Sequence, residues 1–143
     1  MSHKTLLIWV INCLILLLSA CGGPETVDPE EIVELYAEIM YAFNREDLHG
    51  VMKHTSKDFT SDIEDQTTYD EVRKYRQSFI LNNRNVNIDF ENIEIDQGDS
   101  EITVTYDISM VTHRLREKWT QVDILTKTRG SWEIVSSTVA SDR

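Results

Sequence analysis

The stretch Ile-Thr-Val-Thr-Tyr-Asp-Ile-Ser-Met, residues 102–110, is the strongest indicator of the fold. Its even positions are apolar and its odd positions are polar, which is the period of two expected for a β-strand that rests one face on a core. The side chains predicted to point inward are those of Ile102, Val104, Tyr106, Ile108 and Met110. We therefore expect a half-buried antiparallel strand at the centre of the domain.

The same period continues on both sides of this strand. Residues 86–95 alternate as well, but the pattern slips by one position near Glu91 and Asn92, which predicts a β-bulge. Residues 113–117 are predicted to form a charged turn, and Arg129–Gly130 a second turn before the last strand, which ends at Val139. Together these segments predict a meander of four antiparallel strands.

The third of these strands, residues 119–128, has apolar side chains on both faces. Val122 and Ile124 share one parity, and Trp119 and Leu125 share the other. We assign Val122 and Ile124 to the core. Trp119 and Leu125 would then lie on the polar outer face, where exposed apolar side chains indicate a contact surface.

Helices are predicted before the strands. Asp28-Pro29-Glu30-Glu31 combines a capping Asp with proline at the first helical position, and the apolar stripe that follows consists of Ile32, Leu35, Tyr36, Ile39, Met40 and Phe43. A short helix is expected from Leu48 to near His54. A third helix is expected to begin at Thr68-Tyr69-Asp70-Glu71, which has the spacing of a capping box with Thr68 as the cap, and to end near Asn82-Asn83. Residues 55–67 are predicted to be irregular, with a short strand at most. This element order predicts an α+β domain.

The N-terminal residues have the three regions of a secretory signal peptide. His3 and Lys4 are followed by an apolar run over residues 6–18, interrupted only by Asn12, and then by small residues. A transmembrane helix needs about 20 apolar residues, and this run is shorter. We predict that residues 1–20 are removed after export.

The end of this segment, Leu18-Ser19-Ala20-Cys21, resembles the lipobox of bacterial lipoproteins at every position. The resemblance implies cleavage before Cys21 and attachment of diacylglycerol and an acyl chain to that residue. Residues 21–27 would be a lipidated tether and residues 28–143 the folded domain. The resemblance places the protein in the cell envelope, on the extracytoplasmic side, and in the outer membrane of a two-membrane bacterium. An ordinary signal peptide with cysteine at the cleavage point is the alternative.

The charge and the cysteine content exclude several classes of function. The chain has 25 acidic residues against 14 Lys and Arg and a formal charge of −11, which argues against nucleic acid as a partner. Cys13 would leave with the signal peptide, so that Cys21 alone remains and no disulfide can form. No Gly-rich phosphate loop is present, and we expect no cofactor.

The domain resembles the NTF2-like superfamily, which includes SnoaL-like and ketosteroid-isomerase-like proteins. The resemblance rests on the first helix with Asp47-Leu48 after it, on Lys57-Asp58-Phe59, and on the closing hairpin at residues 130–134. It implies a cone in which a curved sheet wraps around the first helix and whose open end holds a small apolar ligand. It also implies a homodimer that forms sheet to sheet, a contact that Trp119 and Leu125 would suit. A cystatin-like domain is the nearest alternative.

The enzymes of that superfamily use a carboxylate inside the cone, which the resemblance implies here only if an acid faces inward. Asp107 and Asp123 lie at odd-numbered strand positions, which we assign to the solvent-facing side of the sheet. Asp58 is the remaining candidate, although a capping or loop role suits it as well. No acid–base set is therefore predicted. We expect a non-catalytic domain that binds a small apolar ligand or a protein partner. The alternative is an isomerase, dehydratase or hydrolase that acts on a small apolar substrate.

Candidate residues for lining the pocket are mainly aromatic: Tyr36, Met40, Tyr75, Tyr106, Ile108 and Trp132. Alternatively, these residues belong to a closed hydrophobic core, and the polar ends of their aromatic side chains lie at the edge of that core. A zinc site is not expected, because His49 and His54 are five residues apart and do not share a helix face. Asp58, Asp62, Glu64 and Asp65 lack the pattern of a calcium loop.

Overall fold

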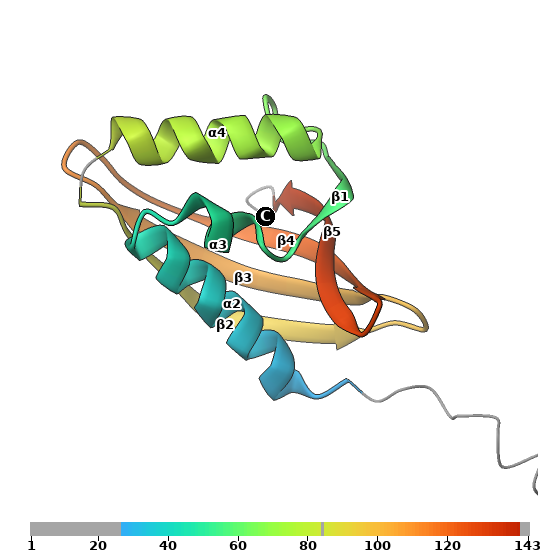
Figure 1. Cartoon of the computed structure of the whole chain (residues 1–143). Helices are drawn as coiled ribbons and strands as arrows, with labels where there is room; N and C mark the ends of the chain where they lie inside the picture. The colour runs from blue at the N-terminus through green and yellow to red at the C-terminus, as the bar shows by residue number, and fades with distance from the viewer. Residues whose placement is uncertain (1–26, 84, 141–143) are drawn as a thin grey trace, which may run out of the picture.

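The computed structural model describes residues 27–83 and 85–140 (Figure 1). The predicted signal peptide, the lipobox and Cys21 lie outside the described residues. The elements, with the labels of Figure 1, are α2 (Pro29–Asn44), α3 (Leu48–Met52), β1 (Thr55–Ser61), α4 (Tyr69–Asn82), β2 (Asn87–Gln97), β3 (Ile102–Val111), β4 (Arg116–Thr128) and β5 (Ser131–Val139). The predicted α+β class is confirmed.

The sheet has five strands in the order β1-β5-β4-β3-β2. Strands β2 to β5 form the predicted antiparallel meander. The fifth strand, β1, comes from the segment predicted to be irregular, and it pairs in parallel with β5 at the edge of the sheet. Phe59 is the only large apolar side chain that β1 buries. Because the pairing is made by backbone groups, the polar sequence of β1 gave only a weak strand signal.

Both long helices begin with the predicted caps. The Asp28 carboxylate accepts a hydrogen bond from the backbone N–H of Glu30, with Pro29 at the first helical position. At the start of α4, the Thr68 hydroxyl accepts from the N–H of Glu71. The residues that begin α2 and α4 are therefore determined by local sequence.

The helices lie on one face of the curved sheet (Figure 1). Helix α2 packs against β2, whereas α4 contacts β1 and α3. The core lies between these helices and the sheet and includes Ile32, Leu35, Tyr36, Ile39, Ile102, Val104 and Leu125. Within the described part of the chain, none of the helices combines the length and the apolar character needed to cross a bilayer.

The bulge in β2 and the turn between β4 and β5 fall where the sequence predicts them. The register of β2 against β3 shifts between Glu91 and Glu94, and Asn92 has a φ of 52°, so the predicted bulge is confirmed. The hairpin between β4 and β5 turns at Arg129 (φ 53°) and Gly130 (φ 86°). Two consecutive positive φ values are typical of the tight hairpin turn that matches the twist of its strands.

The facing predicted for β4 is wrong. Leu125 is fully buried, and Trp119 is packed against the core, whereas Val122 and Ile124 are half-buried on the opposite face. The reason is the register with β3, since residues directly opposite each other in an antiparallel pair point to the same side. The inward residues of β3 pair with odd-numbered residues of β4: Ile102 with Leu125, Val104 with Asp123, Tyr106 with Gln121, and Ile108 with Trp119.

Candidate functional site

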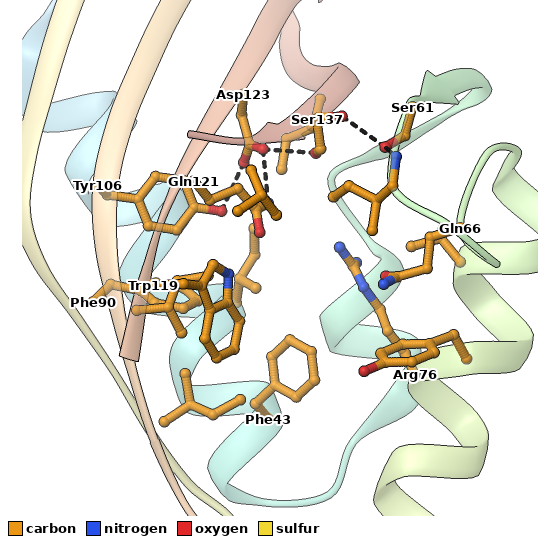
Figure 2. Close-up of a pocket in the computed structure, with 18 of the residues that line it drawn as sticks. Phe43, Ser61, Gln66, Arg76, Phe90, Tyr106, Trp119, Gln121, Asp123 and Ser137 are labelled. Carbon is orange, nitrogen blue, oxygen red and sulfur yellow. Dashed lines mark hydrogen bonds between the residues drawn. The ribbon is translucent and has the colours of Figure 1, made fainter. Parts of the chain in front are cut away.

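A cavity of ≈ 260 Å³ lies between the sheet and the two long helices (Figure 2). Its apolar walls come from all layers of the fold and include Ile39, Phe43, Phe59, Val72, Phe79, Ile88, Phe90, Ile108, Met110, Trp119 and Ile134. Its polar lining consists of Tyr36, Ser61, Gln66, Tyr75, Arg76, Tyr106, Glu117, Gln121, Asp123 and Ser137. A largely apolar hollow with a few converging polar groups is the usual form of a small-molecule site.

Asp123 on β4 is the centre of the polar wall (Figure 2). Its side chain is 1% exposed and accepts four hydrogen bonds. Oδ2 accepts from the hydroxyls of Tyr36 and Tyr106, both at 2.8 Å. Oδ1 accepts from the Ser137 hydroxyl at 2.6 Å and from Nε2 of Gln121 at 2.9 Å. An ionised carboxylate has about four lone-pair sites, so all of them are occupied.

The two tyrosines reach Asp123 from different layers. Tyr36 comes from α2 and Tyr106 from β3, and their ring centroids lie 4.7 Å apart. Phe90 of β2 packs edge-on against Tyr106 at 5.2 Å. Burial, followed by the nearby Asp123 charge, raises the pKa of both phenols well above its ordinary value. Both hydroxyls therefore stay protonated and donate to the carboxylate.

The prediction that Asp123 faces solvent is wrong, because the predicted inner and outer faces of β4 are interchanged. Asp123 pairs with Val104 on one side and with Ser137 on the other, which places it on the inner face. Asp107 does lie on the outer face, where Asn92 and Thr120 donate to it and lower its pKa. Asp58 is exposed on β1 and does not line the cavity.

Arg76 on α4 is the one cationic side chain among the residues that line the cavity (Figure 2). Its Nη1 donates to the carbonyl oxygen of Val51 at 3.1 Å and to the Thr55 hydroxyl at 3.3 Å, and it contacts Sδ of Met52 at 3.5 Å. Burial lowers its pKa, while Tyr106 and Asp123 act in the opposite direction. Across residues 27–83 and 85–140 no carboxylate forms a salt bridge with it.

The candidate pocket residues are divided between the cavity and the core. Tyr36, Tyr75, Tyr106 and Ile108 line the cavity. Met40 is half-buried elsewhere on α2, and Trp132 is buried in the core. The lining residues that were not among these candidates include Arg76, Trp119, Gln121, Asp123 and Ser137. The odd-numbered positions of β4 would have identified Trp119, Gln121 and Asp123, had they been assigned to the inner face. Arg76 could have been found from its helix face, because it lies four residues after Val72 and three before Phe79.

No group of three or more His, Cys, Asp or Glu side chains suited to a metal ion occurs within the described ranges. His54 lies 2.8 Å from a Glu38 carboxylate oxygen, which Lys53 also contacts at 2.7 Å, on the outside of the helical layer. The polar lining of the cavity offers hydrogen bonding through tyrosine, glutamine and serine side chains, and charge through Arg76, Asp123 and Glu117.

A scan against models of known protein families found no match, and a search of curated proteins found none either. Solved structures do match. An NTF2-like protein of unknown function from Pseudomonas putida has a TM-score of 0.71 at 10% identity, over 84% of this chain and 90% of that one. A protein of unknown function with a cystatin-like fold from Nostoc punctiforme gives 0.67 at 19% identity, over 80% and 91%.

A scytalone dehydratase candidate from Novosphingobium aromaticivorans has a TM-score of 0.66 at 15% identity, over 80% of this chain and 83% of that one. At identities this low, the likeness concerns the path of the backbone and not the site. The order of elements, the curved five-stranded sheet and these similar structures together show that residues 28–140 have the NTF2-like fold.

Proposed function

We propose that this protein is an extracytoplasmic lipoprotein whose NTF2-like domain binds a small apolar ligand without catalysing its conversion. The cavity supports the first half of this proposal. Typical ligand pockets range from about 300 to 1,000 Å³, so a volume of ≈ 260 Å³ suits a molecule of one or two rings. The aromatic side chains of Phe43, Phe90 and Trp119 would pack against such rings.

The single observation that supports binding over catalysis is the state of Asp123. A general base needs a free lone pair within reach of the proton that it removes. All lone pairs of Asp123 receive hydrogen bonds from the protein itself. In this arrangement Asp123 orients the tyrosine hydroxyls that face a ligand, and we propose that this is its role.

The binding proposal is tested with neutral two-ring probes such as methyl 2-naphthoate. At about ten times its Kd, such a probe is expected to raise Tm by about 5 °C. Replacing Ile63, which is half-buried and lines the cavity, with tryptophan should abolish the shift by filling the space. Leu81→Trp on α4 is the matched control, since Leu81 is 75% exposed and does not line the cavity. Equal Tm shifts in both variants would contradict the proposal.

The anchor is proposed from residues 18–21, whose sequence supports lipidation. Mass spectrometry of the protein extracted from its native membrane should find residues 1–20 missing and Cys21 carrying diacylglycerol. Cys21→Ser should leave the product unacylated and release it from the membrane fraction, because no thiol remains to accept the lipid. Cys13→Ser, inside the predicted signal peptide, should leave the anchoring unchanged. An intact N-terminal methionine in the native product would contradict this proposal.

A second candidate function is an isomerase, dehydratase or hydrolase of the ketosteroid-isomerase or SnoaL type. The observation in its favour is a buried carboxylate hydrogen-bonded to two tyrosines inside an apolar cavity. That function requires one donor to turn away from Asp123 when substrate enters. The test measures the exchange of a cyclic ketone's α-hydrogens in D₂O. Exchange that is faster with the wild-type protein than in buffer, and that is lost in Asp123→Asn, would favour the enzymatic function over binding alone.

A further inference from the structure

Arg76 has an arrangement that its structural contacts do not explain. All its hydrogen bonds within the described residues come from Nη1, which binds Val51 and Thr55. A guanidinium has five N–H donors, so the three on Nε and Nη2 are left for other partners. The contacts of Nη1 hold the group in place, while its charge lies in the wall of an apolar cavity (Figure 2).

Buried and half-buried charges in proteins are normally paired. Arg76 has no carboxylate within 4.0 Å in residues 27–83 and 85–140, although the chain is strongly acidic. Asp123, the other charge deep in the cavity, is already bonded to Tyr36, Tyr106, Gln121 and Ser137. Glu117, the other carboxylate of the lining, is exposed. Away from solvent, the site therefore contains one cation with free donors and one anion without free acceptors.

This asymmetry discriminates between ligand classes. A cationic ligand would find no unoccupied oxygen on Asp123 and would face the Arg76 charge. An anionic ligand would find the edge formed by Nε and Nη2, whose two parallel N–H bonds match the two oxygens of a carboxylate. Its apolar part would lie against Phe43, which packs 5.8 Å from the guanidinium carbon, and against the aromatic side chains beyond it.

We infer that the ligand of this cavity is a small aromatic or alicyclic carboxylic acid, bound as its carboxylate by Arg76 with its ring against Phe43, Phe90 and Trp119. This inference rests on the proposed function, because it assigns the polar end of the apolar ligand proposed above. Beyond the proposed function, it names Arg76 as a binding residue and specifies that the cavity prefers an anionic ligand to a neutral or cationic one.

The test compares 2-naphthoate with methyl 2-naphthoate and 2-naphthylmethylammonium by calorimetric titration of the folded domain. These probes share their rings and differ in the charge of one group. For the wild-type protein the acid is expected to bind about tenfold more tightly than the ester, or better, and the amine more weakly than either. Arg76→Met should remove the preference, so that the acid and the ester bind with similar affinity.

Two further variants separate charge from structure. Arg76→Lys retains the charge without the planar fork and should give an intermediate preference for the acid. Arg73→Met makes the same substitution at an exposed position of the same helix that does not line the cavity, and should change nothing. A Tm of Arg76→Met close to that of Arg73→Met would show that the cavity is still folded.

The outcomes distinguish the two proposals. Equal affinities for acid and ester in the wild-type protein, or tighter binding of the amine, would overturn the assignment of a carboxylate ligand and leave the apolar site intact. An acid preference that persists in Arg76→Met would overturn it too. Failure of all three probes to bind would remove the proposed function and this inference together.

Discussion

Replacing Asp123 with alanine is expected to lower the free energy of unfolding by about 3 kcal/mol or more. The substitution leaves two tyrosine hydroxyls, the Ser137 hydroxyl and the Gln121 amide without their acceptor, at a position where Asp123 itself is 1% exposed. Each unsatisfied buried donor costs about 1–3 kcal/mol, which the release of a buried charge offsets only in part. Urea denaturation followed by circular dichroism measures the loss.

Two variants serve as controls for this prediction. Asp123→Asn keeps the shape and one acceptor oxygen, and is expected to lie between the wild-type protein and Asp123→Ala. Asp58→Ala removes an exposed carboxylate from β1 and should change the stability by no more than about 0.5 kcal/mol. If Asp123→Ala were as stable as Asp58→Ala, the network of four hydrogen bonds would not be formed in solution.

A second large effect is expected at β4, where two neighbouring apolar residues should respond very differently to truncation. Leu125 has no exposed surface, so Leu125→Ala should cost about 2–5 kcal/mol through lost contacts and the cavity that it leaves. Ile124 is half-buried on the outer face beside Thr103, and Ile124→Ala should cost about 1 kcal/mol. Equal costs, or the reverse order, would contradict the facing of β4.

Repeating the comparison at two protein concentrations tests the homodimer at the same time. Trp119 and Leu125, on which the dimer was predicted, face the interior, so a dimer through the sheet now requires Val122 and Ile124. We retain that dimer as a proposal. Its signature is a cost for Ile124→Ala that grows with protein concentration, since a contact between two copies strengthens by mass action.

Most of the fold could be predicted because its strongest signals are local. The even positions of β3, the bulge at Asn92 and the caps of α2 and α4 depend on residues close in sequence. β1 could not be recognised as a sheet member in this way. It buries one large apolar side chain, and its pairing with β5 joins segments far apart in the chain.

The error at the site has a single physical origin, which is the length of the turn between β3 and β4. The predicted turn, residues 113–117, contains five residues and would pair Thr112 with Lys118. Even-numbered residues of β3 would then lie opposite even-numbered residues of β4. The observed loop, residues 112–115, contains four residues, so that Val111 pairs with Arg116. Even-numbered residues of β3 therefore lie opposite odd-numbered residues of β4, and every side chain of β4 points to the face opposite to the predicted one. The Thr112 hydroxyl, which accepts from the N–H groups of Arg114 and Leu115, marks this tighter loop.

The parallel pairing of β1 with β5 also determines when the cavity is completed. Thr55 pairs with Ile134, and Ser61 with Ser137, so β1 gains its partner only when the last strand of the domain is available. Contacts of such long sequence separation form late, because a long loop has to close first. We therefore expect the α2–α3 hairpin and the β2–β3–β4 meander to assemble early, and a nascent chain lacking residues after 130 to have an open, unfinished ligand site.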